Sequence, residues 1–500
     1  MSHTSEQNGT DGAAQNHHYR IASIPADGIG PEVVRAAIDV VNQVSQTLGT
    51  FTVEFTHIPW GTAYYKEHGR YVDENVLDVL RSYDAGLFGA VGAPDVPDHI
   101  SLWGLLLAIR GPLQLYANVR PVRSFPGTET ALRRANNEDI NWLLVRENSE
   151  GEYSGQGGRS HRGQTWETAT EVSIFTYVGI ERIMRFAFEA AQARPRKLLT
   201  VVTKSNSMRN GMVLWDEVAA KVAKDFPDVK WDKMLVDAMT VRMVNNPKSL
   251  DTIVGTNLHM DILSDLAAAL AGSIGVAPSS NLDPTRKNPS LFEPVHGSAF
   301  DITGKGIANP VATFWSAAEM LAWLGEKDAA KVMMTAVEQV CKAGILSPDL
   351  GGKANTREVT EAVCEEVKRL GSSTKTPIPS VGLLKKLQFG LQFLTLPISY
   401  PRYFLGQSRH ATFSTIDGAQ GTEGWRWLFV IEGVVTFSVA LISTFRYGSS
   451  IYHSTAFRKR SYHNSEENNL RHVGKTKAQS ALQSPRVASS DPRLFLLALT

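Results

Sequence analysis

The sequence has few cysteines, almost no net charge and no apolar segment at its start. Its 500 residues include two cysteines, Cys341 and Cys364, too few for a disulfide framework or a zinc ribbon, which favours a reducing compartment. The formal net charge of +1 gives no reason to expect nucleic acid or an anionic surface as a partner. Residues 1–18 lack both an apolar core and an arginine-rich amphipathic pattern, so we expect a disordered lead-in and no targeting peptide.

The ordered part of the sequence alternates between strand and helix patterns. With 43% hydrophobic residues, the chain has ample material for a core, and its length suggests two or three domains. The turn Asp27-Gly28-Ile29-Gly30 lacks the third glycine of a dinucleotide fingerprint, so we do not expect a Rossmann domain. The alternation favours an α/β fold, with order from Tyr19, strands at 19–25, 51–58 and 85–89, and helices at 32–44 and 72–82.

Two aspartates in the middle of the chain are spaced as one helical turn. Asp261 and Asp265 lie four residues apart in Asp-Ile-Leu-Ser-Asp, so on a helix their carboxylates share a face. Two like charges at this distance repel each other. They need either a cation between them or full solvation, and the spacing alone leaves both alternatives open.

A glycine-rich polar loop is expected about thirty residues farther on. Residues 291–310 carry Gly297, Gly304 and Gly306, which let the backbone approach a ligand closely. The loop also offers the imidazole of His296, the carboxylate of Asp301 and the amide of Asn309. This chemistry suits a nucleotide, although an ordinary glycine-rich turn has the same composition.

Three arginines end apolar segments. Arg110 closes the helix pattern of residues 97–110, and Arg120 and Arg146 each end a strand-like run. A planar guanidinium can bind a carboxylate through two hydrogen bonds, so three of them emerging from element ends suit a dicarboxylate. Any one of them taken alone could equally be structural.

Several motifs together resemble one known family from Tyr19 to about Leu370. The chain is similar to the β-decarboxylating dehydrogenases, which include isopropylmalate and isocitrate dehydrogenases, and most of all to their tartrate/D-malate branch. The segment Pro97–Gly104 in particular resembles that branch and not the isopropylmalate one. The residues that carry the resemblance are Pro97-Asp98-His99-Ile100-Ser101-Leu102-Trp103-Gly104, Arg146–Gly155, Thr203-Lys204-Ser205-Asn206, Asp261–Leu266 and Glu293–Pro310.

The resemblance implies a two-domain isopropylmalate-dehydrogenase-like α/β fold, not a Rossmann domain, and a homodimer with shared active sites in the cytoplasm. It implies NAD and Mn²⁺ or Mg²⁺ as cofactors and a small 2-hydroxy dicarboxylate as the substrate, which is oxidised and decarboxylated. Lys204, from the partner, would take the hydroxyl proton, and Tyr153 would return a proton to the enol. Arg110, Arg120 and Arg146 would hold the substrate, and Asp261 and Asp265 with the partner's Asp237 would hold the metal.

For the nucleotide, the resemblance implies a site whose acidic residue favours NAD. Asp301 would accept hydrogen bonds from the adenosine ribose and repel a 2′-phosphate. The other residues implied in cofactor binding are Asn206, His296, Gly297, Ser298, Ala299 and Asn309. Two positions depart from the family pattern: His259-Met260 replaces Phe-Gly before the first metal aspartate, and Phe300 replaces a proline.

From Gly371 the composition changes. We expect a linker at 371–424, and then a fragment at 425–500 that resembles part of a major-facilitator permease. Its run at 427–445 is long and apolar enough for one membrane span. Such a permease needs many spans, so we expect a largely irregular tail without transport function, holding one hydrophobic helix, and membrane association only if that run inserts.

Alternative functions remain open at this stage. The tail supports a membrane-tethered or transport protein, and His259-Met260 supports a catalytically impaired family member. Within the enzyme class, 3-isopropylmalate or isocitrate is the second choice of substrate. D-malate and tartrate differ by one hydroxyl, and Trp103, Leu106 and Leu107 indicate only a small apolar wall against the substrate.

Overall fold

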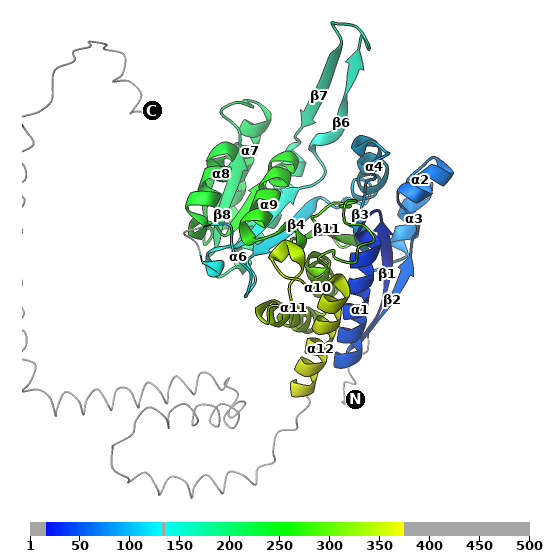
Figure 1. Cartoon of the computed structure of the whole chain (residues 1–500). Coiled ribbons are helices and arrows are strands. Elements are labelled where there is room, and N and C mark those ends of the chain that lie inside the picture. The colour runs from blue at the N-terminus through cyan, green and yellow to red at the C-terminus, as the bar shows by residue number, and fades with distance from the viewer. Residues whose placement is uncertain (1–16, 133–135, 375–500) are drawn as a thin grey trace, which may run out of the picture. The chain divides into compact units, whose positions relative to one another are not determined.

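The computed structural model describes residues 17–132 and 136–374, and in these ranges the strands form one ten-stranded mixed sheet and a separate two-stranded hairpin (Figure 1). In spatial order, the large sheet contains β2 (Phe51–His57), β1 (His17–Ala26), β3 (Ala85–Ala90), β12 (Ser290–Pro294), β11 (Pro278–Leu282), β4 (Ala117–Arg123), β5 (Asn141–Glu147), β10 (Thr252–Gly255), β8 (Leu198–Thr203) and β9 (Lys230–Leu235).

The two ends of this sheet are parallel and its centre is antiparallel. Strands β2, β1, β3 and β12 run parallel to one another, as do β5, β10, β8 and β9. Between them, β11 and β4 pair antiparallel with each other and with their outer neighbours. The central strands therefore join two α/β halves, which is the α/β architecture expected from the sequence and is not a Rossmann arrangement.

Helices cover both faces of the sheet. They are α1 (Gly30–Leu48), α2 (Thr62–His68), α3 (Val76–Arg81), α4 (Asp98–Leu102), α5 (Ala108–Arg110), α6 (Tyr177–Ala193), α7 (Gly211–Val222), α8 (Val236–Asn245), α9 (Asn257–Ala271), α10 (Val311–Leu324), α11 (Lys327–Lys342) and α12 (Thr356–Thr374). A π-helical turn, η1 (Trp103–Leu107), joins α4 to α5, and short 3₁₀ turns are η2 (Asn137–Asp139), η3 (Ala223–Asp225), η4 (Pro247–Ser249), η5 (Ile274–Val276) and η6 (Pro348–Leu350).

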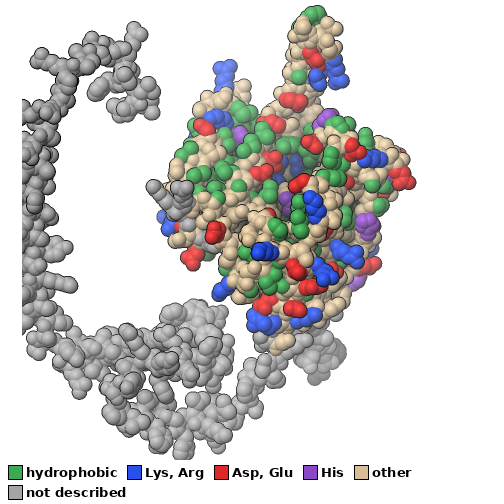
Figure 2. All heavy atoms as spheres, in the orientation of Figure 1, with side chains coloured by type: hydrophobic (Ala, Val, Ile, Leu, Met, Phe, Trp, Pro, Cys, Tyr) green, Lys and Arg blue, Asp and Glu red, His purple; other side chains and the backbone are tan. Residues whose placement is uncertain are grey.

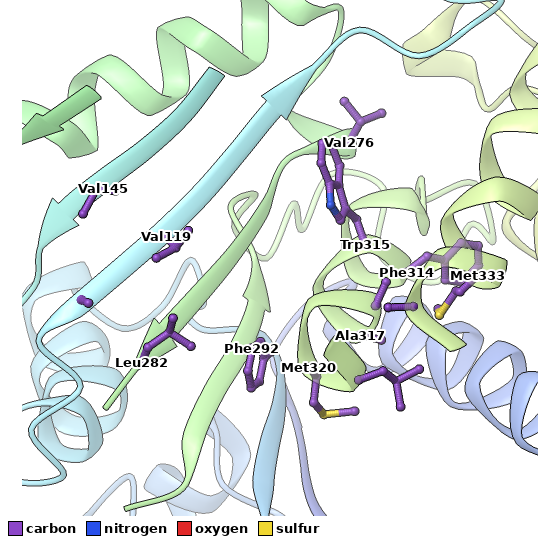
Figure 3. Packing of buried hydrophobic residues seen from close by; sticks show 14 of the residues in the cluster. Val119, Val145, Val276, Leu282, Phe292, Phe314, Trp315, Ala317, Met320 and Met333 are labelled. Carbon is purple, nitrogen blue, oxygen red and sulfur yellow. The ribbon is translucent and has the colours of Figure 1, made fainter. Parts of the chain in front are cut away.

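The core is layered because neighbouring residues of a strand face opposite sides of the sheet. Val145 of β5 belongs to the core cluster on one face, which includes residues of α1, α6, α7, α10, α11 and α12, whereas Leu144 belongs to the cluster on the other face, which includes residues of α8 and α9. Figure 3 shows the first of these cores, with Phe292 of β12 directed toward Phe314 and Met320 of α10. A third cluster lies under α2, α3 and α4 and includes Trp60 and Tyr71.

A hairpin stands out from this layered body. Its strands, β6 (Gly151–Ser160) and β7 (Thr168–Ile174), pair only with each other among the described strands. Figure 2 shows the hairpin projecting beyond the surrounding surface, and most of its side chains are exposed. The base of β6 nevertheless returns to the body at Tyr153, which is half-buried.

Several expected elements have the predicted positions, with small differences at their ends. The helix expected at 32–44 is α1, and the helix expected at 97–110 is α4, η1 and α5 in succession. The expected linker from 371 overlaps the end of α12, because Gly371 lets this helix pack closely against Thr47 of α1. The apolar run 427–445 and the permease-like fragment lie outside the described residues. No helix within 17–132 and 136–374 has the length and apolarity to cross a bilayer.

Candidate active site

Three buried arginines come together from neighbouring elements. Arg110 ends α5, Arg120 lies in β4 and Arg146 lies in β5, and their exposed fractions are 4%, 8% and 3%. Arg146 stands opposite Asn118 in the antiparallel ladder, so Arg120, two residues farther along β4, projects from the same face. The register of the two central strands therefore brings together side chains that are distant in the sequence.

The three guanidinium groups line a cavity of 190 Å³, which also receives Leu106 and Leu102 from the segment before Arg110. Burial and the neighbouring charge of Arg146 lower the pKa of Arg110 to about 9 and that of Arg120 to about 10. A crowded set of cations under low solvent access is a site prepared for a small polyanion. The cavity is therefore suited in both size and charge to a small dicarboxylate.

Of the two aspartates of α9, Asp261 lines this cavity. Thr256 caps the helix by accepting a hydrogen bond from the His259 backbone N–H, and one turn later Asp261 forms an ion pair with Arg146. Burial opposes ionisation of Asp261, but the charges of Arg146 and Arg120 outweigh it and hold the pKa of its carboxyl below the usual value. At Asp265, burial raises the pKa. Both carboxylates thus lie on one helix, as the spacing predicted.

Tyr153 reaches the same place from the hairpin. Its hydroxyl lies 3.4 Å from Oδ2 of Asp261, and its ring centroid is 5.5 Å from the guanidinium carbons of both Arg110 and Arg146. Burial and the charge of Asp261 raise the pKa of Tyr153, so it remains protonated at neutral pH. A protonated phenol beside the arginines can donate a proton to a bound ligand.

The apolar wall differs in part from the one expected. Leu106 lines the arginine cavity, whereas Trp103 and Leu107 line an adjoining hollow of 210 Å³ on the other side of Arg110 and Tyr153. The π-helical turn at Trp103–Leu107 changes the direction of these side chains, and a 3.6-residue period could not predict it.

Sequence reasoning missed a buried polar network beneath the arginines. Glu293 of β12 is 7% exposed and lines the cavity, and Oε1 of its carboxylate accepts a hydrogen bond from Nδ2 of Asn281 at 2.7 Å. Asn281 in turn accepts from Asn118, whose carbonyl oxygen accepts from Nε of Arg120 at 2.8 Å. Burial raises the pKa of Glu293. Its only sequence signal was an acidic residue inside an otherwise apolar strand pattern.

Lys204 and Asp237 lie together, and neither lines the arginine cavity. Nζ of Lys204, after β8, is 2.6 Å from Oδ1 of Asp237 in the first turn of α8, and this hydrogen bond lowers the pKa of Asp237. Asn206 follows Lys204 and is exposed. Within 17–132 and 136–374, no three ligand-type side chains converge as a metal site. Among the described residues, Asp261 and Asp265 are therefore two hard oxygen donors without a third ligand-type side chain converging on them.

The bulky pair His259-Met260 does not enter the cavity. Met260 is fully buried in the core under α9, where its side chain fills the space beside Gly255. His259 is mostly buried, and burial lowers its pKa, so its imidazole is neutral at pH 7. The departure from the family pattern is thus accommodated on the core side of the helix.

The glycine-rich loop lies beside the cavity, after β12. His296 and Gly297 line the cavity, and Nδ1 of His296 is 3.0 Å from the Gly297 carbonyl oxygen. No described residue is a hydrogen-bond partner for Nε2 of this buried histidine. Asp301 is exposed, as is Phe300, with 40% of its surface accessible.

Distant residues hold this loop in place. Asp349 accepts a hydrogen bond from Nδ2 of Asn309 at 2.9 Å, and Glu32 accepts one from the Ala308 backbone N–H at 3.2 Å. The Ser298 carbonyl oxygen accepts from the Ile29 backbone N–H at 2.8 Å. The loop that carries Ser298, Ala299 and Asp301 is thereby anchored at several points. The anchors were invisible in the sequence because they are remote from the loop along the chain.

Comparison with known proteins gives consistent matches over the same part of the chain. Residues 20–363 match the family Isocitrate/isopropylmalate dehydrogenase. A probable tartrate dehydrogenase/decarboxylase of Agrobacterium vitis is 64% identical over 349 residues, covering 70% of this chain and 96% of the relative. The D-malate dehydrogenase (decarboxylating) of Escherichia coli (strain K12) is 47% identical over 357 residues, covering 70% and 99%. The crystal structure of an isocitrate dehydrogenase from Methylococcus capsulatus aligns with a TM-score of 0.64 at 36% identity, covering 70% of this chain and 99% of that one.

Proposed function

The chain belongs to the isocitrate/isopropylmalate dehydrogenase family, and we propose that it oxidises and decarboxylates D-malate or tartrate with NAD and a divalent metal ion. The observation that carries this proposal is the convergence of Arg110, Arg120 and Arg146 on a cavity of 190 Å³ beside Asp261. The names of the relatives indicate the same substrates. Isopropylmalate or isocitrate is the second candidate, because it requires the same arginines with a larger cavity.

Substrate binding follows from charge and geometry. The guanidinium forks of the three arginines bind the two carboxylates, and each charge-assisted hydrogen bond contributes about 1.5–3 kcal/mol. Leu102 and Leu106 close one side and exclude water from the carbon chain. The carboxylate of Glu293 lies beneath the arginines and compensates part of their positive charge. The remaining positive charge is available to bind the dianionic substrate.

Asp261 and Asp265 would hold Mn²⁺ or Mg²⁺, which polarises the substrate's C2 oxygen and stabilises the charge left when CO₂ departs. The donor set fits such a hard cation in kind, since both ligands are carboxylates, but one chain supplies only these two. Asp261 is paired with Arg146, so its carboxylate would have to be shared between this arginine and a bound cation.

Two proton transfers are assigned to side chains. Lys204 of a second copy would accept the C2 hydroxyl proton, and NAD would supply the oxidation by taking the C2 hydride; the bond between C3 and its carboxylate would then break to release CO₂. Tyr153 donates its proton to C3 of the resulting enol. Its position over Arg110 and Arg146 supports this role, because the same guanidinium groups that orient the substrate also fix the phenol.

The homodimer with shared sites rests on the exposed faces of α8 and α9. Val241 and Val244 are 57% and 44% exposed and share a face of α8 with Asp237, at i, i+4 and i+7. On α9, Ile262 is 55% exposed and lies one turn from Asp265. A two-fold contact that buries these apolar side chains would carry Asp237 of each chain toward the metal aspartates of the other.

The nucleotide is proposed to bind the loop at residues 296–309, with Asn206 of the second copy on the opposite side. The exposed carboxylate of Asp301 can accept hydrogen bonds from ribose hydroxyls and would repel a 2′-phosphate, which supports NAD over NADP.

Both Cys341 and Cys364 are free thiols, which supports a cytoplasmic location.

The test is a substrate panel with NAD and Mn²⁺: D-malate, the tartrate stereoisomers, 3-isopropylmalate and isocitrate, with NADH and released CO₂ measured together. We expect the highest kcat/KM for D-malate or a tartrate, with NADH and CO₂ in equal amounts on D-malate. A higher kcat/KM for 3-isopropylmalate or isocitrate would overturn the substrate assignment, and absence of turnover on all of them would favour an impaired family member.

A further inference from the structure

A buried carboxylate outside the proposed machinery lies between its two ligand-binding segments. Asp27, in the turn between β1 and α1, is 8% exposed and does not line the arginine cavity. It accepts three hydrogen bonds: from the backbone N–H of Thr62 at 2.8 Å, from the Thr62 hydroxyl at 2.7 Å and from the backbone N–H of Gly92 at 2.9 Å. Three donors aimed at one carboxylate fix its position tightly.

On one side, this network reaches the helix that carries the substrate wall. The Thr62 hydroxyl donates its proton to the hydrogen bond with Asp27. In the 3.1 Å hydrogen bond between the Thr62 and Tyr71 hydroxyls, Tyr71 is therefore the donor. The ring of Tyr71 packs closely against Gly104 of η1. A Cβ atom at position 104 would lie only 2.7 Å from Cδ2 of Tyr71. Asp27 is thus connected through Thr62 and Tyr71 to the helical segment that ends at Arg110.

On the other side, the same turn supports the nucleotide loop. The backbone N–H of Ile29 donates to the Ser298 carbonyl oxygen, and a Cβ on Gly28 would lie 1.9 Å from that oxygen. Gly92, which donates to Asp27, lies between the segments: a Cβ there would be 3.8 Å from Oγ of Ser298 and 3.9 Å from Oγ of Ser101 in α4.

We propose that Asp27 is a positioning residue that couples the substrate helix (Asp98–Arg110) to the nucleotide loop (His296–Asn309), so that binding of the dicarboxylate strengthens binding of the dinucleotide. Movement of the helix toward a bound dicarboxylate is transmitted by Tyr71, Thr62 and Asp27 to Gly92 and the turn under Ser298. The inference rests on the proposed function, because it requires that both ligands bind at these two segments.

The experiment measures this coupling with a probe that cannot touch the substrate. ADP-ribose contains the adenosine and diphosphate of NAD but no nicotinamide, so any effect of D-malate on its affinity passes through the protein. Its dissociation constant is measured by calorimetry on the full-length protein with Mn²⁺, with and without saturating D-malate. In the wild type we expect D-malate to tighten ADP-ribose binding by about fivefold or more.

The variants are Asp27→Asn and Thr62→Val, each compared with a matched control. Asp283 is the control carboxylate, because it is 1% exposed and accepts hydrogen bonds from the backbone N–H and the hydroxyl of Thr285 and from the Asn288 backbone N–H, in a turn between β11 and β12. Asp283→Asn and Thr285→Val should lower the thermal midpoint as their counterparts do, and leave the coupling unchanged.

We expect Asp27→Asn and Thr62→Val to reduce the effect of D-malate to less than about twofold, whereas the controls keep the wild-type ratio. Thr62→Val preserves the volume of the side chain, so it reports the coupling even if Asp27→Asn fails to fold. This inference alone would be overturned if the Asp27 and Thr62 variants bind both ligands and D-malate tightens ADP-ribose binding as much as in the wild type. It would also be overturned if the wild type binds both ligands without any effect of D-malate on the affinity for ADP-ribose. Failure of the wild type to bind D-malate would overturn the proposed function as well.

Discussion

Replacement of Arg110 by methionine should make the protein more stable and nearly inactive. The charge of Arg110 is poorly compensated in the unliganded protein: the side chain is 4% exposed, and its Nε and Nη2 atoms have no hydrogen-bond partner among the described residues. Two further guanidinium groups, those of Arg120 and Arg146, share the cavity with it. Methionine matches the arginine side chain as far as Nε, and it can pack against Leu102 and Leu106.

The magnitude follows from the pKa. A fall in the pKa of Arg110 to about 9 corresponds to about 5 kcal/mol of strain on its charged form, at ~1.36 kcal/mol per pKa unit. Relaxation around buried charges reduces such penalties, and replacing buried ions by apolar side chains typically gains about 1–4 kcal/mol. We therefore expect Arg110→Met to raise the free energy of unfolding by about 1–3 kcal/mol. Loss of two charge-assisted hydrogen bonds to substrate should lower kcat/KM by about 10²–10⁴-fold.

Chemical denaturation without ligand measures the first quantity, and initial rates with D-malate or tartrate measure the second. Arg123→Met is the matched control, because Arg123 forms an ion pair of 2.5 Å with Glu338 and its removal should destabilise the protein with little effect on kcat/KM. Equal destabilisation by the Arg110 and Arg123 substitutions would contradict the reasoning, since it would show that Arg110 is well compensated before substrate binds.

Three further predictions follow from the site and the chain ends. Excess chelator should abolish turnover and Mn²⁺ or Mg²⁺ should restore it, because Asp261 and Asp265 need a cation between them; full activity in chelator would disprove the metal assignment. Asp301→Asn should reduce the ratio of kcat/KM with NAD to kcat/KM with NADP by about tenfold, because the repulsion of a 2′-phosphate is lost. An unchanged ratio would show that Asp301 does not lie at the ribose. A chain that ends after Thr374, where α12 ends, should keep kcat and the thermal midpoint, and loss of folding would show that residues beyond it belong to the core.

Local patterns in the sequence were sufficient for much of the fold and for the placement of several site residues. The four-residue spacing of Asp261 and Asp265 is realised on α9, and the apolar run before Arg146 is strand β5. Arg120, expected at a strand end, lies inside β4, which continues to Arg123. These predictions succeeded because each depends on a short segment whose hydrophobic period fixes its structure.

The rest depends on contacts between distant segments. Asn118, Asn281 and Glu293 join into one network only because β4, β11 and β12 are neighbours in the sheet, and no local pattern predicts that order. Likewise, Asp27 appeared only as part of an incomplete dinucleotide fingerprint, whereas the fold connects it to Thr62 and Gly92. The direct contact between Lys204 and Asp237 likewise joins residues that no local pattern connects.

The most direct test of the account asks whether two chains build each site. Lys204→Ala protein is mixed with an equal amount of Asp261→Ala protein, and the mixture is unfolded and refolded. If Lys204 serves the partner's Asp261, a mixed dimer collects both lesions in one site and leaves the other intact. About half of the randomly paired dimers are mixed, so activity should recover to roughly a quarter of the wild type, while each variant refolded alone stays near zero. A mixture no more active than the separate variants, with mixed dimers demonstrated by mass measurement, would show that Lys204 acts within its own chain.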